Sequence, residues 1–327
     1  MCICVHYLCF EWKTDILAGQ SLEYSGDMKQ ATEILCHLRE DIPSTECGWI
    51  ASLDNALANI YIQRGEWRLA LGSLDRIIDL TPQVVRAEVR SFLSGNSSTT
   101  SVDAESEEIV TSLLTKAYVC EILSRQGRIF LQVGALSESR EVFDAATTLW
   151  ANNVESSTSL SSISLPEEIS NRNRSLRVVI QSLLEINDGL FHFSKSDYDE
   201  ALHHFSTAID IFRSDSSIFH SQYRTQDWVG PTVAGCQAPS LLYNEAVNNT
   251  SLCNLYMCNM NEAIFALEVL VREDPTAFLT ERVAFNLCTL YELGSDSAVA
   301  TRKKRVLQII AKRFFLHDVG PESFRVT

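Results

Sequence analysis

The chain has 327 residues, of which 46% are hydrophobic and 21% charged, so it is long enough for a substantial core in one to three domains. Its formal net charge of −15 repels polyanions, and we expect no nucleic-acid partner. The ten cysteines include no Cys-x-x-Cys pair, which is more typical of reduced cytosolic thiols than of a disulfide framework.

The N-terminal segment, residues 1–13, is apolar. It has no cationic start and no small-residue cleavage site, and Glu11 and Lys13 end the apolar run short of the roughly 20 residues that a membrane span needs. We therefore expect neither export nor direct membrane insertion. We interpret the segment as the end of a helix whose neighbour is missing, as in the remnant of a longer chain.

The next two segments repeat each other. Each has a small residue in a first helix, a glycine at the turn, an alanine where the second helix packs back, and a proline that we expect to stop the second helix. The equivalent residues are Gly26 and Gly65, Ala31 and Ala70, and Pro43 and Pro82, the last two pairs both 39 residues apart. This is the pattern of a tetratricopeptide repeat, and Trp67 is expected to be one of its buried aromatic residues.

Four more copies follow with weaker patterns. Their packing residues are Gly127, Phe143 and Ala146, then Gly189, Ala201 and Phe205, then Ser251, Ala263 and Pro275, and finally Cys288, Tyr291 and Ala300. Apolar residues recur at helical spacing in every copy, and nothing alternates over enough residues to indicate a sheet. The sequence therefore predicts an all-α tetratricopeptide-repeat α-solenoid of about five to six helix pairs.

Polar stretches separate the later copies. We predict loops at 94–106 and 151–170, which are rich in serine, and at 214–239, which contains two glycines and two prolines. Long first helices are expected between them, at about 107–132 and 172–195. The predicted organisation is an N-terminal segment at 1–13, a solenoid at 14–313 and a C-terminal tail at 314–327.

No catalytic, cofactor-binding or metal-binding motif is found, so we predict no enzyme activity and no cofactor. His203 and His204 are adjacent on one helix and point in different directions, which does not suit chelation. Cys253 and Cys258 are interpreted as core thiols. The basic run 302–305 is interpreted as the solvated face of an amphipathic helix.

Four residues are candidates for binding a partner on the inner face of the repeats. A chaperone adaptor that binds a C-terminal carboxylate needs Lys and Asn side chains from successive first helices. Asn55 and Asn59 offer the amides, and Arg125 and Arg128 in the next copy offer cations. The lysine expected on the first helix is instead Asn55. A co-chaperone adaptor is therefore the alternative hypothesis.

A family resemblance supports a different function. The order of the repeats, the Ser-rich breaks between them, the helix pair around Gly65, Trp67 and Ala70, and above all the block 285–293 (FNLCTLYEL) resemble the C-terminal repeat region of subunit 12 of the TRAPP trafficking complex. The resemblance extends from about Thr14 to about Lys312, and it supplies no motif residues for contacts with partners.

The resemblance implies a non-catalytic component of a cytosolic tether that acts in vesicle traffic between the endoplasmic reticulum and the Golgi and in autophagy. Such a subunit would hold the large peripheral subunits 8 and 11 in place. It would associate with endoplasmic reticulum and Golgi membranes only peripherally, through the complex.

Overall fold

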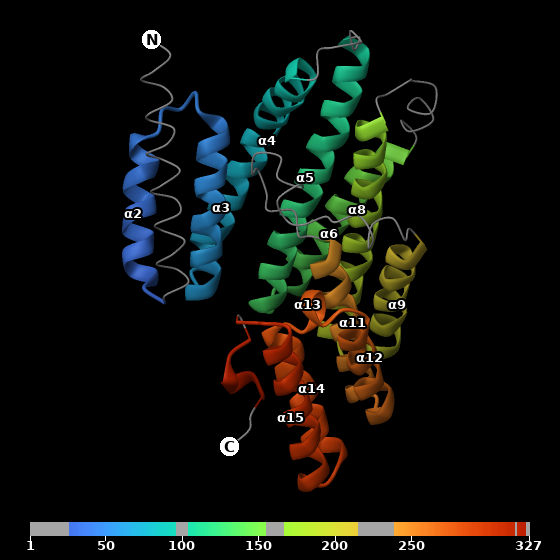
Figure 1. Ribbon diagram of the computed structural model, residues 1–327. Helices are drawn as coiled ribbons and strands as arrows, with labels where there is room; N and C mark the ends of the chain where they lie inside the picture. The colour runs from blue at the N-terminus through green and yellow to red at the C-terminus, as the bar shows by residue number, and fades with distance from the viewer. Residues whose placement is uncertain (1–25, 96–103, 155–166, 215–238, 318, 325–327) are drawn as a thin grey trace. The chain divides into compact units, whose positions relative to one another are not determined.

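Helices account for nearly all of the computed structural model, which describes residues 26–95, 104–154, 167–214, 239–317 and 319–324 (Figure 1). No strand occurs in these ranges. The described helices fall into two compact units, and α8 crosses the division between them at Asn173 and Arg174. The all-α repeat fold predicted from the sequence is confirmed.

The first unit is a row of antiparallel helices, each packed on the next along the chain (Figure 1). The unit consists of α2 (Met28–Asp41), α3 (Cys47–Arg64), α4 (Trp67–Gly95), α5 (Ala104–Gln132) and α6 (Leu136–Val154). The partner predicted for α2 would lie in residues 1–25, which are outside the described residues, as is the N-terminal segment 1–13.

The second unit repeats this arrangement with two short additions. It consists of α8 (Glu167–Ser194) from Arg174 onward, α9 (Tyr198–Ser214), α11 (Pro239–Tyr256), α12 (Met260–Glu273), the single turn α13 (Pro275–Phe278), α14 (Glu281–Gly294), α15 (Ser297–Arg313) and the 3-10 helix η1 (Pro321–Phe324). In the described parts of the two units we count five helix pairs together with α2.

Each helix pair is closed by two small residues that are 12 positions apart in the sequence. The pairs are Ala58 and Ala70, Gly127 and Ser139, Gly189 and Ala201, Ser251 and Ala263, and Cys288 and Ala300. All ten residues are buried. A Cβ added at Gly127 would lie 2.3 Å from the Phe143 ring, and one at Gly189 would lie 2.6 Å from the Phe205 ring. The second helix therefore places an aromatic ring where the first has no side chain.

The turn between paired helices uses a residue in the left-handed region of backbone space. This residue lies five positions before the packing residue of the second helix, at Gly26, Gly65, Gly134, Ser196 and Cys258, with φ between 63° and 87°. Ser295, at the same position of the last pair, is extended with φ of −149°. The predicted glycine turns are confirmed at the three glycine positions.

Helix α4 corrects the prediction that Pro82 stops a helix. The helix runs without interruption from Trp67 to Gly95. A proline inside a helix costs about 3 kcal/mol, since it removes one backbone hydrogen bond. Beyond it, however, Val84, Val85 and Val89 are buried, and each fully buried valine contributes about 1.5–3 kcal/mol. The burial of these valines outweighs the cost of the proline.

Three other expectations need adjustment. Trp67 is only half-buried, because it lies at the first residue of α4. The predicted loops are shorter than expected, since residues 94–95, 104–106, 151–154 and 167–170 are helical, while the middle of each lies outside the described residues. After Phe314, the tail packs back on α14 and α15 through η1, and Val319 and Phe324 are buried there.

Candidate protein-binding surfaces

The structure brings three of the four predicted partner-binding residues together in the first unit. Arg125 of α5 donates from Nη1 to Oδ1 of Asn55 at 2.6 Å and from Nη2 to Oδ1 of Asn59 at 2.8 Å. Both asparagines lie on α3, one helical turn apart. The guanidinium therefore links the first helices of two successive repeats.

The fourth residue, Arg128, lies one turn further along α5 and acts on Arg125 electrostatically. The pKa of Arg125 is lowered chiefly by burial. Glu121 raises this pKa, and the nearby positive charge of Arg128 lowers it again. Arg125 is thus held among neighbours of both signs, and two of its five N–H groups are engaged by the asparagines.

The same connection recurs in the second unit. Asn286 of α14 donates from Nδ2 to Oδ1 of Asn248 on α11 at 2.8 Å. Arg125 and Asn286 each lie two residues before the small packing residue of their helix, and Asn55 and Asn248 each lie three residues before theirs. Because the contact repeats at equivalent positions, we interpret it as a polar ladder between first helices. This interpretation gives Asn55, Asn59 and Arg125 a structural role alongside any ligand.

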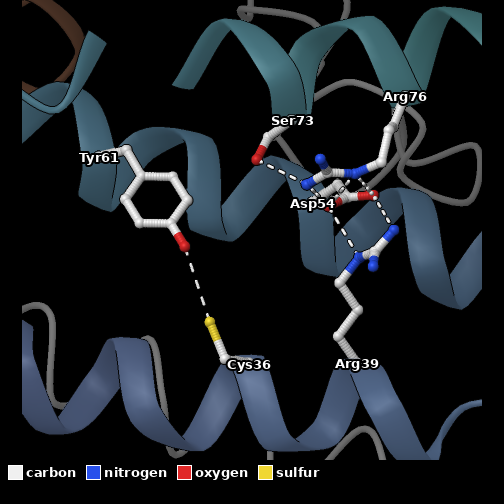
Figure 2. Close-up of polar contacts among 6 residues, drawn as sticks. All are labelled: Cys36, Arg39, Asp54, Tyr61, Ser73 and Arg76. Atoms are coloured by element: carbon white, nitrogen blue, oxygen red, sulfur yellow. Dashed lines mark hydrogen bonds and ion pairs between the residues drawn. The ribbon is translucent and has the colours of Figure 1, made fainter. Parts of the chain in front are cut away.

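A buried carboxylate ties α2, α3 and α4 of the first unit together (Figure 2). The Asp54 side chain on α3 is fully buried and accepts hydrogen bonds from Arg39 of α2 at 3.1 Å and from Arg76 of α4 at 2.6 Å. Arg76 also donates to the Ser73 hydroxyl at 3.0 Å. The bond to Asp54 is the main cause that raises the pKa of Arg76. Both guanidiniums are needed because a buried carboxylate is costly without partners.

Tyr61 and Cys36 form a second contact between α2 and α3 (Figure 2). The Tyr61 hydroxyl lies 3.6 Å from Cys36 Sγ. Burial, together with this contact, raises the pKa of Tyr61 to about 12. The hydroxyl therefore stays protonated, and the contact is structural rather than reactive.

An aromatic cluster, formed by Phe193, Tyr198 and Tyr256, lies at two neighbouring turns of the second unit. The Tyr198 and Tyr256 rings stack at 4.9 Å, and Phe193 meets them edge-on at 5.3 and 5.5 Å. Tyr256 is 57% exposed. Exposed tyrosines are enriched among the residues that dominate protein interfaces. The sequence analysis missed this cluster, whose only signal was an aromatic residue next to each turn.

Three histidines lie on the same two helices as Phe193 and Tyr198, namely His192 on α8 and His203 and His204 on α9. His192 stacks on His204 at 5.4 Å, and His204 Nδ1 lies 2.8 Å from the Glu185 carboxylate. His203 is exposed. Among the described residues, no group of three or more His, Cys, Asp or Glu side chains has the arrangement of a metal site.

Two interpretations of charged and thiol residues are corrected by the structure. Within the basic run 302–305, Lys304 is buried and paired with Glu292, and Lys303 bonds Glu268 at 3.1 Å, so only Arg302 and Arg305 are exposed. Cys253 is a core thiol as predicted, but Cys258 is exposed because it occupies a turn. In the parts of the chain that the structure describes, no helix is long and apolar enough to cross a bilayer.

These features define the class of protein: an all-α chain of tetratricopeptide type, with polar links between repeats and exposed aromatic residues at turns. No family model matches the chain. Two curated relatives are both named trafficking protein particle complex subunit 12. The chain is 37% identical to the mouse protein over 68 residues and 26% identical to the human protein over 191 residues.

The matched regions are partial on both sides. They cover 21% and 58% of this chain, but only 8% of the mouse and 19% of the human protein. The chain therefore spans about a fifth or less of the length of these relatives. The similarity is to one part of that subunit.

Solved structures of other proteins align along most of the chain. BtubC from P. vanneervenii aligns with a TM-score of 0.43 at 12% identity, covering 90% of this chain and 92% of its own. The TPR2AB domain of yeast Sti1, in its complex with pHSP90, aligns with a TM-score of 0.28 at 14% identity, covering 94% of this chain and 93% of its own. These values are too low for an inference from either structure to this chain.

Proposed function

We propose that this chain is a non-catalytic scaffold that binds other proteins, as a peripheral subunit of a TRAPP-type vesicle-tethering complex. The observation that carries the proposal is the 26% identity to human subunit 12 over 191 residues. In this role the chain holds the large peripheral subunits 8 and 11. It acts in traffic between the endoplasmic reticulum and the Golgi and in autophagy, on membranes that it reaches through the complex.

The physical properties of the fold support a scaffold. Stacked repeats offer large, preorganised surfaces, so binding loses little entropy on ordering. The aromatic cluster adds rigid, amphipathic contact area at an exposed turn, and Tyr256 is its most exposed described member. A surface of this kind gains affinity from a few anchors.

The alternative of a co-chaperone adaptor is less well supported. A carboxylate clamp requires free amide and cationic groups that converge on the ligand. Arg125 donates two of its N–H groups to Oδ1 of Asn55 and Asn59, which engages the cation but not the amide N–H groups, and the equivalent contact between Asn286 and Asn248 has no cation at all. These contacts favour a link between repeats.

The test is co-purification of the full chain, tagged at its own locus, followed by mass spectrometry and size-exclusion chromatography. We expect TRAPP subunits, including 8 and 11, in one large assembly. Replacing Tyr198 and Tyr256 by alanine should weaken the association by at least about tenfold, as expected for hot-spot aromatics. The matched double replacement by phenylalanine keeps both rings and should retain the assembly.

A peptide ending in Glu-Glu-Val-Asp separates the two hypotheses. We expect no measurable binding of this peptide to the purified chain. Micromolar binding that is lost on Asn59→Ala, combined with the absence of TRAPP subunits from the purified material, would replace the scaffold proposal with the adaptor. Wild-type-like assembly of the double alanine variant would remove the aromatic cluster from the proposal.

A further inference from the structure

The outer face of α15 differs in chemistry from the rest of this acidic protein. Helix α15 contains six basic residues and no acidic residue. One stripe of it is exposed and consists only of basic and aliphatic side chains, at spacings of three or four residues: Arg302, Arg305, Val306, Ile309, Lys312 and Arg313. Val306 is 54% exposed and Ile309 63%. We call these six residues the α15 stripe.

The cations of the α15 stripe are not neutralised within the described part of the chain. Lys303 and Lys304, which lie off the stripe, form ion pairs with Glu268 and Glu292. No carboxylate of the described residues forms an ion pair with Arg305, Lys312 or Arg313. The whole chain has a net charge of −15, so the positive charge of the stripe is opposite in sign to that of the protein as a whole.

Comparison with α9 shows that the fold does not require aliphatic residues at the positions of Val306 and Ile309. When Ala300 is aligned with Ala201, the packing residue of α9, Val306 corresponds to Thr207 and Ile309 to Asp210. The solvated face of a helix in a soluble protein is normally polar, as it is in α9. The stripe therefore exposes two aliphatic side chains where the fold accepts polar ones.

A groove adjoins the stripe. A cavity of about 180 Å³ lies between α12, α14 and α15, and Val306 borders both the cavity and the stripe. The other apolar residues that line the cavity are Val271, Leu287, Tyr291, Leu307 and Ile310. An apolar cavity of about 150 Å³ accommodates a benzene ring, so this groove has room for a leucine or phenylalanine side chain.

The rim of the groove is positive. Its one carboxylate, Glu268, accepts hydrogen bonds from Arg272 at 2.6 Å, Tyr291 at 3.0 Å and Lys303 at 3.1 Å. Two cations thus share one anion there. The groove and the stripe together form a surface with an apolar centre and a positive border.

We propose that this surface binds an acidic amphipathic helix of a partner protein, with an aliphatic or aromatic anchor in the groove and Asp or Glu side chains against the α15 stripe. Charge complementarity selects this occupant. In a symmetric dimer, a second copy of the chain would place the same cations against each other. An anionic bilayer would meet only two aliphatic side chains and would be repelled by the rest of the protein. The proposal goes beyond the proposed function and does not depend on it.

The test uses the full chain and a fluorescent designed peptide of about 18 residues, or five helical turns, with leucines at i, i+3 and i+4 spacing and glutamates elsewhere. We expect micromolar binding that weakens with salt. A peptide of the same composition in scrambled order should bind at least about tenfold more weakly, and a peptide with lysine in place of glutamate should not bind.

Variants of the chain assign the binding to the proposed surface. Val306→Ser with Ile309→Ser, and separately Arg302→Glu with Arg305→Glu, should each weaken binding of the acidic peptide by at least about tenfold. Arg68→Glu with Arg86→Glu makes the same charge change on exposed residues of α4 and should leave binding unchanged. Circular dichroism and thermal melting confirm that each variant is folded.

Three outcomes would overturn the proposal. They are absence of peptide binding, equal binding of the scrambled peptide, and binding that is indifferent to the α15 substitutions. Vesicles that contain phosphatidylserine are tested in parallel. If the chain binds them and loses that binding in the α15 variants, the surface is a membrane contact instead.

Discussion

Ser196 and Cys258 occupy turn positions at which three other turns use glycine. Their φ angles are 63° and 64°. For a residue with a Cβ, the left-handed conformation costs roughly 1–2 kcal/mol, because the Cβ approaches the following carbonyl oxygen. The fold therefore stores local strain at these two turns.

Replacing Cys258 by glycine should relieve that strain. Glycine offsets part of this gain, because it loses about 0.5–1 kcal/mol more conformational entropy on folding than a residue with a Cβ. The net stabilisation should therefore reach about 1 kcal/mol. The measurement is the midpoint of urea unfolding. The reverse change, Gly134→Ala, places a Cβ in open space at φ of 78° and should lower the midpoint. A lower midpoint for Cys258→Gly would show that the turn is not strained.

Buried thiols make a prediction about alkaline pH. Burial raises the pKa of Cys120 from 9.0 to about 12. Between these values the unfolded chain loses the proton while the folded chain keeps it. The stabilisation is therefore complete below pH 9 and is lost as the pH rises towards 12, by up to about 1.4 kcal/mol per pH unit.

Cys120→Ala should flatten this loss. Unfolding midpoints from about pH 8.5 to about pH 10.5 should fall less steeply in the variant, although its stability at neutral pH is lower because a buried atom is removed. Cys258→Ala removes an exposed thiol and serves as the matched control. Parallel curves for Cys120→Ala and the parent would exclude a contribution from this thiol.

Several residue-level errors of the sequence analysis have one cause. Helical spacing places Cys258 and Lys304 on faces of a helix, but it does not report where a helix ends or which carboxylate lies opposite. Cys258 lies in the turn after α11, and Lys304 is buried against Glu292, which lies 12 residues earlier on α14. Such positions depend on contacts between elements.

Among the elements, α5 and α6 show how closely paired helices approach. Gly127 of α5 lies against the Phe143 ring of α6, and the Ser139 hydroxyl donates to the Gly127 carbonyl oxygen at 2.9 Å. Ser251 and Ala263 make the mirrored contact in α11 and α12 at 2.7 Å. Serine thus satisfies the spacing that alanine satisfies elsewhere and adds a hydrogen bond.

Gly127→Ala should destabilise the first unit. The new Cβ would overlap the Phe143 ring, and overpacking of this kind typically costs 1–3 kcal/mol. Gly72→Ala is the matched control, because its Cβ would lie 3.8 Å from the nearest side chain. That change should be neutral or stabilising by up to about 1 kcal/mol, since alanine favours a helix. Equal effects in urea unfolding would mean that the ring moves aside.

The repeated pattern of small residues made the elements predictable from the sequence. The pairs 12 positions apart require close packing, so they mark both helices and their turn together. Pro82 was misjudged because the rule that proline ends a helix is local, whereas burial of Val84, Val85 and Val89 depends on the neighbouring helices. The prediction of a first helix pair is not tested, because residues 1–25 lie outside the described residues.

Across the whole molecule, the polar stretches are predicted to be its most accessible backbone. Limited proteolysis should cut first within 96–103, 155–166 or 215–238, because the sequence there is polar or rich in helix breakers. Time-resolved mass spectrometry identifies the sites. Early cuts inside α3 or α14 would contradict the assignment of these helices to packed repeats.

The candidate surfaces were less predictable than the fold. Helix geometry correctly placed Asn55, Asn59 and Arg125 near one another, but it did not foresee that they bond each other. The aromatic cluster combines residues of two turns about 60 positions apart, and the α15 stripe becomes evident only when its exposure is known. Surfaces depend on which residues remain uncovered, and a single sequence does not record this.

Asp54 limits the modularity of the repeats. Consensus repeat proteins tolerate the exchange, deletion or duplication of single units because each unit contacts its neighbours through equivalent residues. The pair α3 and α4 does not satisfy this condition, since its buried carboxylate, Asp54, forms an ion pair with Arg39 of the preceding helix α2. If this pair were grafted into another array, Asp54 would be buried there with Arg76 but without Arg39. The transferable unit is therefore the three-helix block α2, α3 and α4.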